Sequence, residues 1–239
     1  MSWCDLSEIR KFQIESNKDL TFSKVFVPKY LEKLSNFNEK KIIEIGCGTG
    51  HLAKELTNLI KFEHYIALEP SLGMYEKAKD TLKNCKYLEL NNFYISDLKS
   101  SIEVDIILAH LVFHVVEDID SLLKESFKRL KPNATLVISL PHPFFYNDYK
   151  KIFSKNEYSY HEEIKKNTLF KISQDNTNEV EVPYIHRPIS YYINKFSKAG
   201  FKISELEEVF PEESIQLLYP ELWQSPRYCI FYLEKILVD

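Results

Sequence analysis

The chain has 239 residues, of which 44% are hydrophobic and 28% are charged, and this size and composition fit one α/β domain with an insertion. The net charge of −4 and a basic content that is nearly all lysine disfavour nucleic acid as the main partner, and no run approaches the ~18 apolar residues of a membrane span. Four cysteines without metal-ligand spacing favour a reducing, cytoplasmic location and no metal site.

The first predicted elements surround a glycine-rich turn. Residues 1–40 are expected to be partly helical and to form an N-terminal helical cap. The apolar run Ile42–Ile45 predicts a buried strand, and apolar residues at helical spacing from Leu52 predict a helix. Between them, alternate positions are glycine, a residue that permits positive φ and lets a ligand approach the backbone.

The spacing of these glycines narrows the ligand. A dinucleotide fingerprint needs its third glycine where this chain has His51, and the lysine of a P-loop is missing. The stretch Glu44-Ile45-Gly46-Cys47-Gly48-Thr49-Gly50 instead resembles the E/D-x-G-x-G-x-G motif of class I S-adenosylmethionine (SAM)-dependent methyltransferases, in particular the small-molecule, methyltransferase type 11-like group. The alternative is a glycine-rich turn without a ligand. The resemblance implies cofactor binding by Glu44, Gly46, Cys47, Gly48 and Gly50.

A second strand is predicted at Tyr65–Leu68, and it ends in Glu69. An acid about 20 residues beyond the glycines suits the ribose hydroxyls of a nucleoside, because a carboxylate can accept from both. Residues 69–78 resemble the family's D/E-x-S-x-x-M-x-x-x-A stretch, which implies that Pro70 and Met74 also border the cofactor. A solvent-exposed acid at the strand end is the alternative for Glu69.

The third predicted strand, Tyr87–Leu90, is followed by two asparagines. In the family the residues after this strand meet the adenine edge, and an acid is more usual there. Asn91 and Asn92 are therefore the candidates, since an amide supplies both a donor and an acceptor. The residues alone leave open which of the two points inward, or whether the pair forms a plain turn.

The fourth predicted strand, Asp105–Ala109, runs into two histidines. His110 and His114 share one face if the segment is helical, but H-E-x-x-H is absent and no third zinc ligand is evident. In the family this segment borders the methyl-transfer site. The resemblance makes His110 a candidate for cofactor contact and for catalysis, and His114 a candidate for acceptor binding. Structural histidines are the alternative.

A helix is predicted over 118–130 and a fifth strand over 135–140. The strand ends in Pro141-His142-Pro143-Phe144, and this H-P-F motif resembles a subset of small-molecule methyltransferases in which the region after this strand builds the acceptor pocket. The resemblance makes His142 the first candidate for the general base and Phe144 a candidate for acceptor binding. A rigid turn with a surface histidine is the alternative.

Residues 144–185 are too many for an ordinary α/β connection of ~2–6 residues, and they are rich in tyrosine and phenylalanine. Their place in the chain predicts a lid-like insertion over the acceptor site. A surface insertion or a dimer contact is the alternative.

The stretch from Tyr184 to Pro188 opens a helix that Gly200 closes. Its H-R-P start, followed by a helix and A-G-F, resembles the same subset, in which these residues face the acceptor. The resemblance implies that Tyr184 and Arg187 bind the acceptor, that His186 is a second candidate base, and that Arg187 holds a carboxylate or phosphate. A surface ion pair is the alternative for Arg187.

The elements together predict an α/β fold with a Rossmann-like, seven-stranded, mostly parallel sheet. Its last two strands, near 202–209 and 228–236, are expected to form a C-terminal antiparallel hairpin. The whole chain, 1–239, is predicted to be one methyltransferase domain with a helical cap and a lid-like insertion after the fifth strand.

The predicted function is transfer of a methyl group from SAM to an oxygen or nitrogen atom of a small-molecule metabolite, with S-adenosylhomocysteine (SAH) as product. In-line displacement in a water-poor pocket gains ~7–11 kcal/mol from positioning alone. An oxygen acceptor also needs a base, for which the order is His142, His186 and His110. The alternatives are a tRNA or protein methyltransferase and a non-catalytic SAM-binding subunit. The expected partner is a small-molecule methyl acceptor, not a membrane, and a homodimer is left open.

Overall fold

The computed structural model describes residues 3–35, 37–99, 101–172, 174–175 and 179–236. The chain divides into two compact units. Unit 1 comprises residues 1–94, 169–182 and 211–223, and unit 2 comprises residues 95–168, 183–210 and 224–239. The expectation of a single domain over 1–239 stays a prediction.

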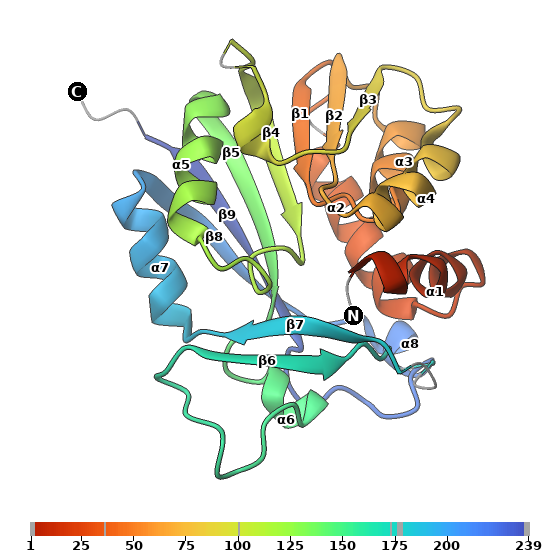
Figure 1. Cartoon of the computed structure of the whole chain (residues 1–239), viewed down its shortest axis with the longest axis vertical. Coiled ribbons are helices and arrows are strands. Elements are labelled where there is room, and N and C mark those ends of the chain that lie inside the picture. The colour runs from red at the N-terminus through yellow and green to blue at the C-terminus, as the bar shows by residue number, and fades with distance from the viewer. Residues whose placement is uncertain (1–2, 36, 100, 173, 176–178, 237–239) are drawn as a thin grey trace. The chain divides into compact units, whose positions relative to one another are not determined.

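Seven strands form one mostly parallel sheet in the order β3-β2-β1-β4-β5-β9-β8 (Figure 1). In unit 1, β1 (Lys41–Ile45) pairs in parallel with β2 (His64–Leu68), and β2 pairs in parallel with β3 (Leu88–Asn91). In unit 2, β4 (Val104–His110) runs parallel to β5 (Leu130–Pro141), whereas β9 (Tyr228–Lys235) is antiparallel to β5 and to β8 (Phe201–Val209). This order and the terminal antiparallel pair confirm the predicted fold class.

The helices of unit 1 follow the apolar spacing of the sequence. The segment predicted as a helical cap contains α1 (Trp3–Glu15), a π-helical segment (Thr21–Phe26) and α2 (Val27–Leu34). The glycine turn leads directly into α3 (His51–Leu59), and the end of β2 leads into α4 (Leu72–Leu82). A short helix, α8 (Glu213–Gln216), also belongs to this unit. The strand–turn–helix order that was predicted around the glycines is therefore confirmed.

Unit 2 contains a short 3-10 turn (Ile95–Asp97), α5 (Ile119–Arg129), α6 (Tyr146–Lys150) and α7 (Ile189–Lys198). The carboxylate of Asp118 caps α5 by accepting from the Ser121 N–H at 2.9 Å. Strand β5 begins at Leu130, earlier than the predicted start at residue 135. Within the strand, Asn133 has a left-handed backbone with a φ of 60°, which asparagine tolerates better than most residues.

The segment predicted as a lid contains α6 and a separate two-stranded sheet. This sheet pairs β6 (Ile164–Leu169) with β7 (Glu181–His186) (Figure 1). Residues 173 and 176–178 of the segment lie outside the described residues. The lid function stays a prediction. Among the described residues, no helix has the length and hydropathy needed to cross a membrane.

Candidate active site

The glycine turn joins the end of β1 to the start of α3. Gly46, Gly48 and Gly50 have left-handed backbones, with φ values of 65°, 57° and 79°. A Cβ at such positions is strained, which explains why the turn needs glycine. A Cβ built on Gly48 would meet no atom within 4 Å, so it would project into open space beside the turn. The turn therefore presents bare backbone to a ligand.

Glu69, at the end of β2, is fixed against this turn. Its two carboxylate oxygens accept hydrogen bonds from the N–H groups of Gly48 and Ser71, both at 2.8 Å. The residue is buried, and burial raises the pKa of the carboxyl while the two N–H donors lower it. Each oxygen keeps a further lone pair, so the carboxylate can still accept from two vicinal hydroxyls. The structure thus brings Glu69 and Gly48 together, as predicted.

The two asparagines after β3 differ in their contacts. The Asn92 side-chain amide donates to the carbonyl oxygens of Glu69 at 2.8 Å and of Pro70 at 3.2 Å. The Asn91 side chain instead donates to the Glu89 carboxylate at 2.9 Å. Of the pair, Asn92 is therefore the residue held beside Glu69, and its amide oxygen remains an acceptor there.

Glu44 and Cys47 are the other two side chains predicted at the turn, and both are buried. Glu44 accepts from the Tyr65 hydroxyl at 2.8 Å, and burial, opposed by this bond, raises the pKa of Glu44 to about 7. Burial also raises the pKa of the Cys47 thiol, which keeps this thiol protonated and unreactive. Glu44 ties β1 to β2, and its contact with a cofactor stays a prediction.

Replacing Glu44 with glutamine should remove a pH-dependent part of the stability. An unfolded glutamate titrates near 4.5, so between that pH and about 7 the folded chain keeps a proton that the unfolded chain has lost. Wild-type stability should therefore fall, relative to Glu44→Gln, by about 3 kcal/mol as the pH rises through this window. Urea unfolding of both proteins measures the difference, and Glu63→Gln, an exposed site, should keep the wild-type slope. A difference between wild type and Glu44→Gln that does not change with pH would contradict this account.

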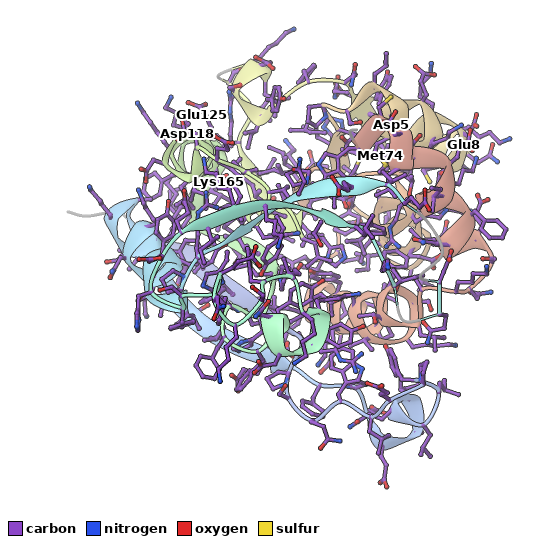
Figure 2. All side chains as sticks on the ribbon, turned by 60° about the horizontal axis from the view of Figure 1, so that its bottom comes forward. Asp5, Glu8, Met74, Asp118, Glu125 and Lys165 are labelled. Atoms are coloured by element: carbon purple, nitrogen blue, oxygen red, sulfur yellow. The ribbon has the colours of Figure 1, made fainter. Side chains whose placement is uncertain are left out.

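Met74 of α4 lies in a hydrophobic cluster with α1 (Figure 2). Met74, Leu6 and Val182 are its buried members. The two helices approach closely, since a Cβ on Gly73 would lie 2.5 Å from the Cys4 sulfur. The structure therefore shows that Met74 has a packing role, and its contact with a cofactor stays a prediction.

In unit 2, β4 ends in His110, and the next residue, Leu111, has a strained left-handed backbone with a φ of 54°. The buried Ser139 of β5 contacts both residues. Its hydroxyl oxygen lies 2.8 Å from His110 Nδ1 and accepts from the Leu111 N–H at 3.0 Å. A hydroxyl has one proton to donate and two lone pairs to accept with, so this contact fits either tautomer of His110. Sequence reasoning missed Ser139, because a lone serine within a strand forms no motif.

The first candidate base, His142, is buried and bonded through both ring nitrogens. Its Nδ1 accepts from the N–H groups of Phe144 at 3.2 Å and Phe145 at 3.4 Å, and its Nε2 lies 3.0 Å from Glu208 Oε1. These bonds fix the turn after β5 and occupy the lone pair that a base needs, which corrects the order that put His142 first. Phe144 is exposed, with its ring 5.3 Å from that of Tyr160.

Five rings of unit 2 form what we call the histidine–aromatic cluster. Tyr184 is central, because its ring lies 5.8 Å from those of His114 and Tyr146 and 6.1 Å from that of Phe153. The ring of His186 lies 6.3 Å from that of Phe153. Tyr184 and His186 occupy alternate positions of β7, so they share one side of the strand. The structure thus brings together His114, Tyr184 and His186, which were predicted separately.

Each histidine of the cluster keeps one ring nitrogen that no described residue binds. His186 Nε2 donates to the Tyr160 carbonyl at 3.1 Å, which leaves the lone pair on Nδ1 without a partner among the described residues. His114 Nδ1 is buried and has no hydrogen-bond partner in the described part of the chain. Burial, together with the nearby Arg187, lowers the pKa of His114 to about 3, so its ring is neutral at pH 7.

The contacts of Arg187 disagree with its predicted role, which was to bind an anionic group of the substrate. Its side chain is fully buried, and its Nε donates to Glu163 at 2.6 Å. The two terminal nitrogens donate to the carbonyl oxygens of Phe113 at 3.1 Å and Glu117 at 3.3 Å. These bonds commit the guanidinium to the protein itself, which corrects the prediction.

Comparison with known families identifies the kind of enzyme to which the glycine turn belongs. A family profile described as a methyltransferase domain matches residues 43–136. Residues 43–136 form a SAM-dependent methyltransferase domain. The match begins in β1 and ends in β5, so it contains the glycine turn, Glu69 and His110.

The methyltransferase also has named relatives. It is 27% identical over 191 residues to an uncharacterized protein of Haemophilus influenzae, covering 76% of this chain and 74% of that one. It is 26% identical over 195 residues to a malonyl-[acyl-carrier protein] O-methyltransferase of Bacillus anthracis, covering 78% and 69%. A solved SAM-dependent methyltransferase from Mesorhizobium loti shares the fold, with a TM-score of 0.67 and 18% identity over 86% of this chain and 97% of that one.

SAM is the cofactor of the methyltransferase, and the residues of unit 1 fit it. The open space at Gly48 would admit the ligand against bare backbone, and the free lone pairs of Glu69 suit ribose hydroxyls. Asn92, which follows β3, would hold Glu69 in place through its bond to the Glu69 carbonyl oxygen. When bound, SAM supplies a methyl group on a positively charged sulfur that a nucleophile can displace.

Proposed function

We propose that the methyltransferase methylates an oxygen or nitrogen atom of a small-molecule metabolite. The observation that supports this best is the histidine–aromatic cluster, in which two neutral imidazoles keep unbonded nitrogens among aromatic rings. Such mostly buried, ring-rich surroundings suit a small acceptor without strong charge, since rings bury apolar area and a few polar atoms fix orientation. The unavailability of Arg187 argues against an acceptor that depends on a paired anion.

His186 is the residue that we assign as general base. Donation from Nε2 to Tyr160 places the lone pair on Nδ1, and burial lowers the pKa of the ring, so Nδ1 is unprotonated at neutral pH. Nδ1 would accept the proton of the acceptor hydroxyl or amine as that atom takes the methyl group. His114 and Tyr184 would orient the acceptor through hydrogen bonds and ring contact.

The names of relatives favour oxygen as the acceptor atom. Proteins of Bacillus anthracis and Priestia megaterium that are similar to this chain are malonyl-[acyl-carrier protein] O-methyltransferases. From these names, the second candidate acceptor is an acyl carboxylate on a carrier protein. A carboxylate needs no base, but it needs cationic or N–H partners, and Arg187 is already paired with Glu163. We therefore place a hydroxyl acceptor first.

A methyl-transfer screen tests the proposal. The protein is incubated with SAM that carries a deuterated methyl group and with separate pools of hydroxylated metabolites, amines, malonyl-carrier protein and tRNA. Mass spectrometry then detects SAH and the labelled product. We expect a labelled small molecule. A labelled tRNA whose binding weakens steeply with salt, or SAH binding without methyl release on any pool, would contradict the proposal.

With the acceptor found in that screen, His186→Gln should lower kcat by about 100-fold or more, and His142→Gln by less than about tenfold. Glutamine can keep the donor to Tyr160, but it has no lone pair basic enough to take a proton. Burial lowers the pKa of His186 below 6.5, so the rate should rise with pH along an acid limb below that value. His186→Gln should lack this limb. A larger loss of kcat in His142→Gln than in His186→Gln would assign the general base to His142 instead.

A further inference from the structure

A histidine that the proposed mechanism does not use lies between the N-terminal helix and the glycine turn. His51 is the first residue of α3, and 7% of its surface is exposed. Its Nδ1 lies 2.9 Å from the hydroxyl of Thr49, a buried residue of the glycine turn. Its Nε2 is also buried and has no hydrogen-bond partner within the described residues. A carboxylate oxygen of Glu15, the last residue of α1, lies 3.7 Å from that nitrogen.

The surroundings of His51 determine where its proton lies. Burial dominates and lowers the pKa of His51 to about 4, while Glu15 raises it and Arg10 and Lys54 lower it, so the ring is neutral at pH 7. Of the two neutral forms, the Glu15 carboxylate favours the one with the proton on Nε2, because a lone pair there would face a negative charge. Nδ1 then accepts from the Thr49 hydroxyl.

The Nε2–H of His51 therefore points toward an acceptor that is slightly too far away. A charge-assisted N–H···O bond is about 2.7–2.9 Å long, so the gap to Glu15 exceeds it by about 0.8 Å. A cavity of about 440 Å³ lies beside the end of α1, with Glu15, Lys54 and Asp80 among its lining residues, so the Glu15 side chain is not tightly packed. Glu15 is half exposed, which leaves its side chain free to turn.

We propose that His51 is a positioning residue for the cofactor turn, which it holds through Thr49 while it binds Glu15 at the end of α1 once the cofactor is in place. The inference rests on the proposed placement of SAM at the glycine turn. A bound cofactor displaces water there, and a hydrogen bond to a carboxylate strengthens as water leaves. Because coupling is reciprocal, the closure of α1 adds to the affinity for the cofactor.

A double-mutant cycle with SAH tests the coupling. Isothermal titration calorimetry compares the wild type, Glu15→Gln, His51→Phe and the double variant. Each single variant should bind SAH about tenfold more weakly, and the double variant should bind no more weakly than His51→Phe alone. The matched control is His64→Gln, since His64 starts β2 of the same unit and should leave the affinity unchanged.

Hydrogen exchange separates positioning from a merely structural role. SAH should slow amide exchange in α1 of the wild type, and this protection should be lost in Glu15→Gln. If His51→Phe does not fold, Glu15→Gln carries the test, because the Glu15 side chain is exposed. An affinity of Glu15→Gln within about twofold of the wild type, or exchange in α1 that SAH does not change, overturns the inference. A wild type that does not bind SAH overturns the proposed cofactor site instead.

Discussion

Replacing Glu69 with alanine should weaken the binding of SAH by at least about 100-fold. The buried carboxylate holds the N–H groups of Gly48 and Ser71, and it offers the remaining lone pairs to the ribose. Alanine removes both functions, so the ribose loses its acceptors and the glycine turn loses the group that fixes it. Isothermal titration calorimetry with SAH measures the loss directly.

The control for Glu69 is a carboxylate of the same unit that has no place in the site. Glu76 of α4 is half exposed and pairs with Lys79, so Glu76→Ala should keep the wild-type affinity. Thermal unfolding of Glu69→Ala should remain cooperative, because two unpaired N–H groups cost only a few kcal/mol at most, about 1–3 each. If Glu69→Ala is folded and binds SAH within about threefold of the wild type, Glu69 does not hold the cofactor.

Replacing Arg187 with leucine should cost about 3–5 kcal/mol of the free energy of unfolding, the largest stability effect that we expect. The guanidinium is fully buried and donates to Glu163 and to the carbonyl oxygens of Phe113 and Glu117. Leucine fills part of the volume but leaves all three acceptors without a donor. The free energy of unfolding of Arg187→Lys should lie between those of the wild type and Arg187→Leu, since one ammonium group cannot bond all three acceptors that the planar guanidinium reaches. Urea unfolding measures the series.

A surface pair from the same unit provides the comparison. Lys165, labelled in Figure 2, is half exposed and pairs with the Glu117 carboxylate at 3.0 Å. Lys165→Met should therefore change stability by no more than about 1 kcal/mol. Wild-type stability of Arg187→Leu, together with a raised KM for an anionic acceptor, would instead support the substrate role that the sequence suggested.

The fold and the glycine turn could be predicted because their signals are local. Each glycine of the turn has a positive φ that other residues rarely adopt, so the positions of the glycines in the sequence indicate the conformation of the backbone. Glu69 follows from the same logic, since parallel strands end at one edge of a sheet and bring their final residues together. The choice between Asn91 and Asn92 was beyond the sequence, because it depends on which amide reaches the carbonyl oxygen of Glu69.

The acceptor side was less predictable because its decisive contacts join residues far apart in the chain. Glu208, which binds His142, is 66 residues away, and Glu163, which binds Arg187, is 24 residues away. The H-P-F and H-R-P motifs show that these residues are unusual, but they do not show what pairs with them. Met74 likewise owes its burial to α1 and to Val182. A histidine or arginine in a motif therefore indicates that the residue has a specific role. Only its contacts in the fold show whether that role is structural or chemical.

A crystal structure of the protein with SAH tests most directly whether the glycine turn and Glu69 hold the cofactor. We predict that the ribose hydroxyls lie within hydrogen-bonding distance of the Glu69 carboxylate and that the ligand passes over the bare backbone of Gly48. Electron density for SAH at another place, or none at saturating SAH with the turn accessible in the crystal, would contradict this placement.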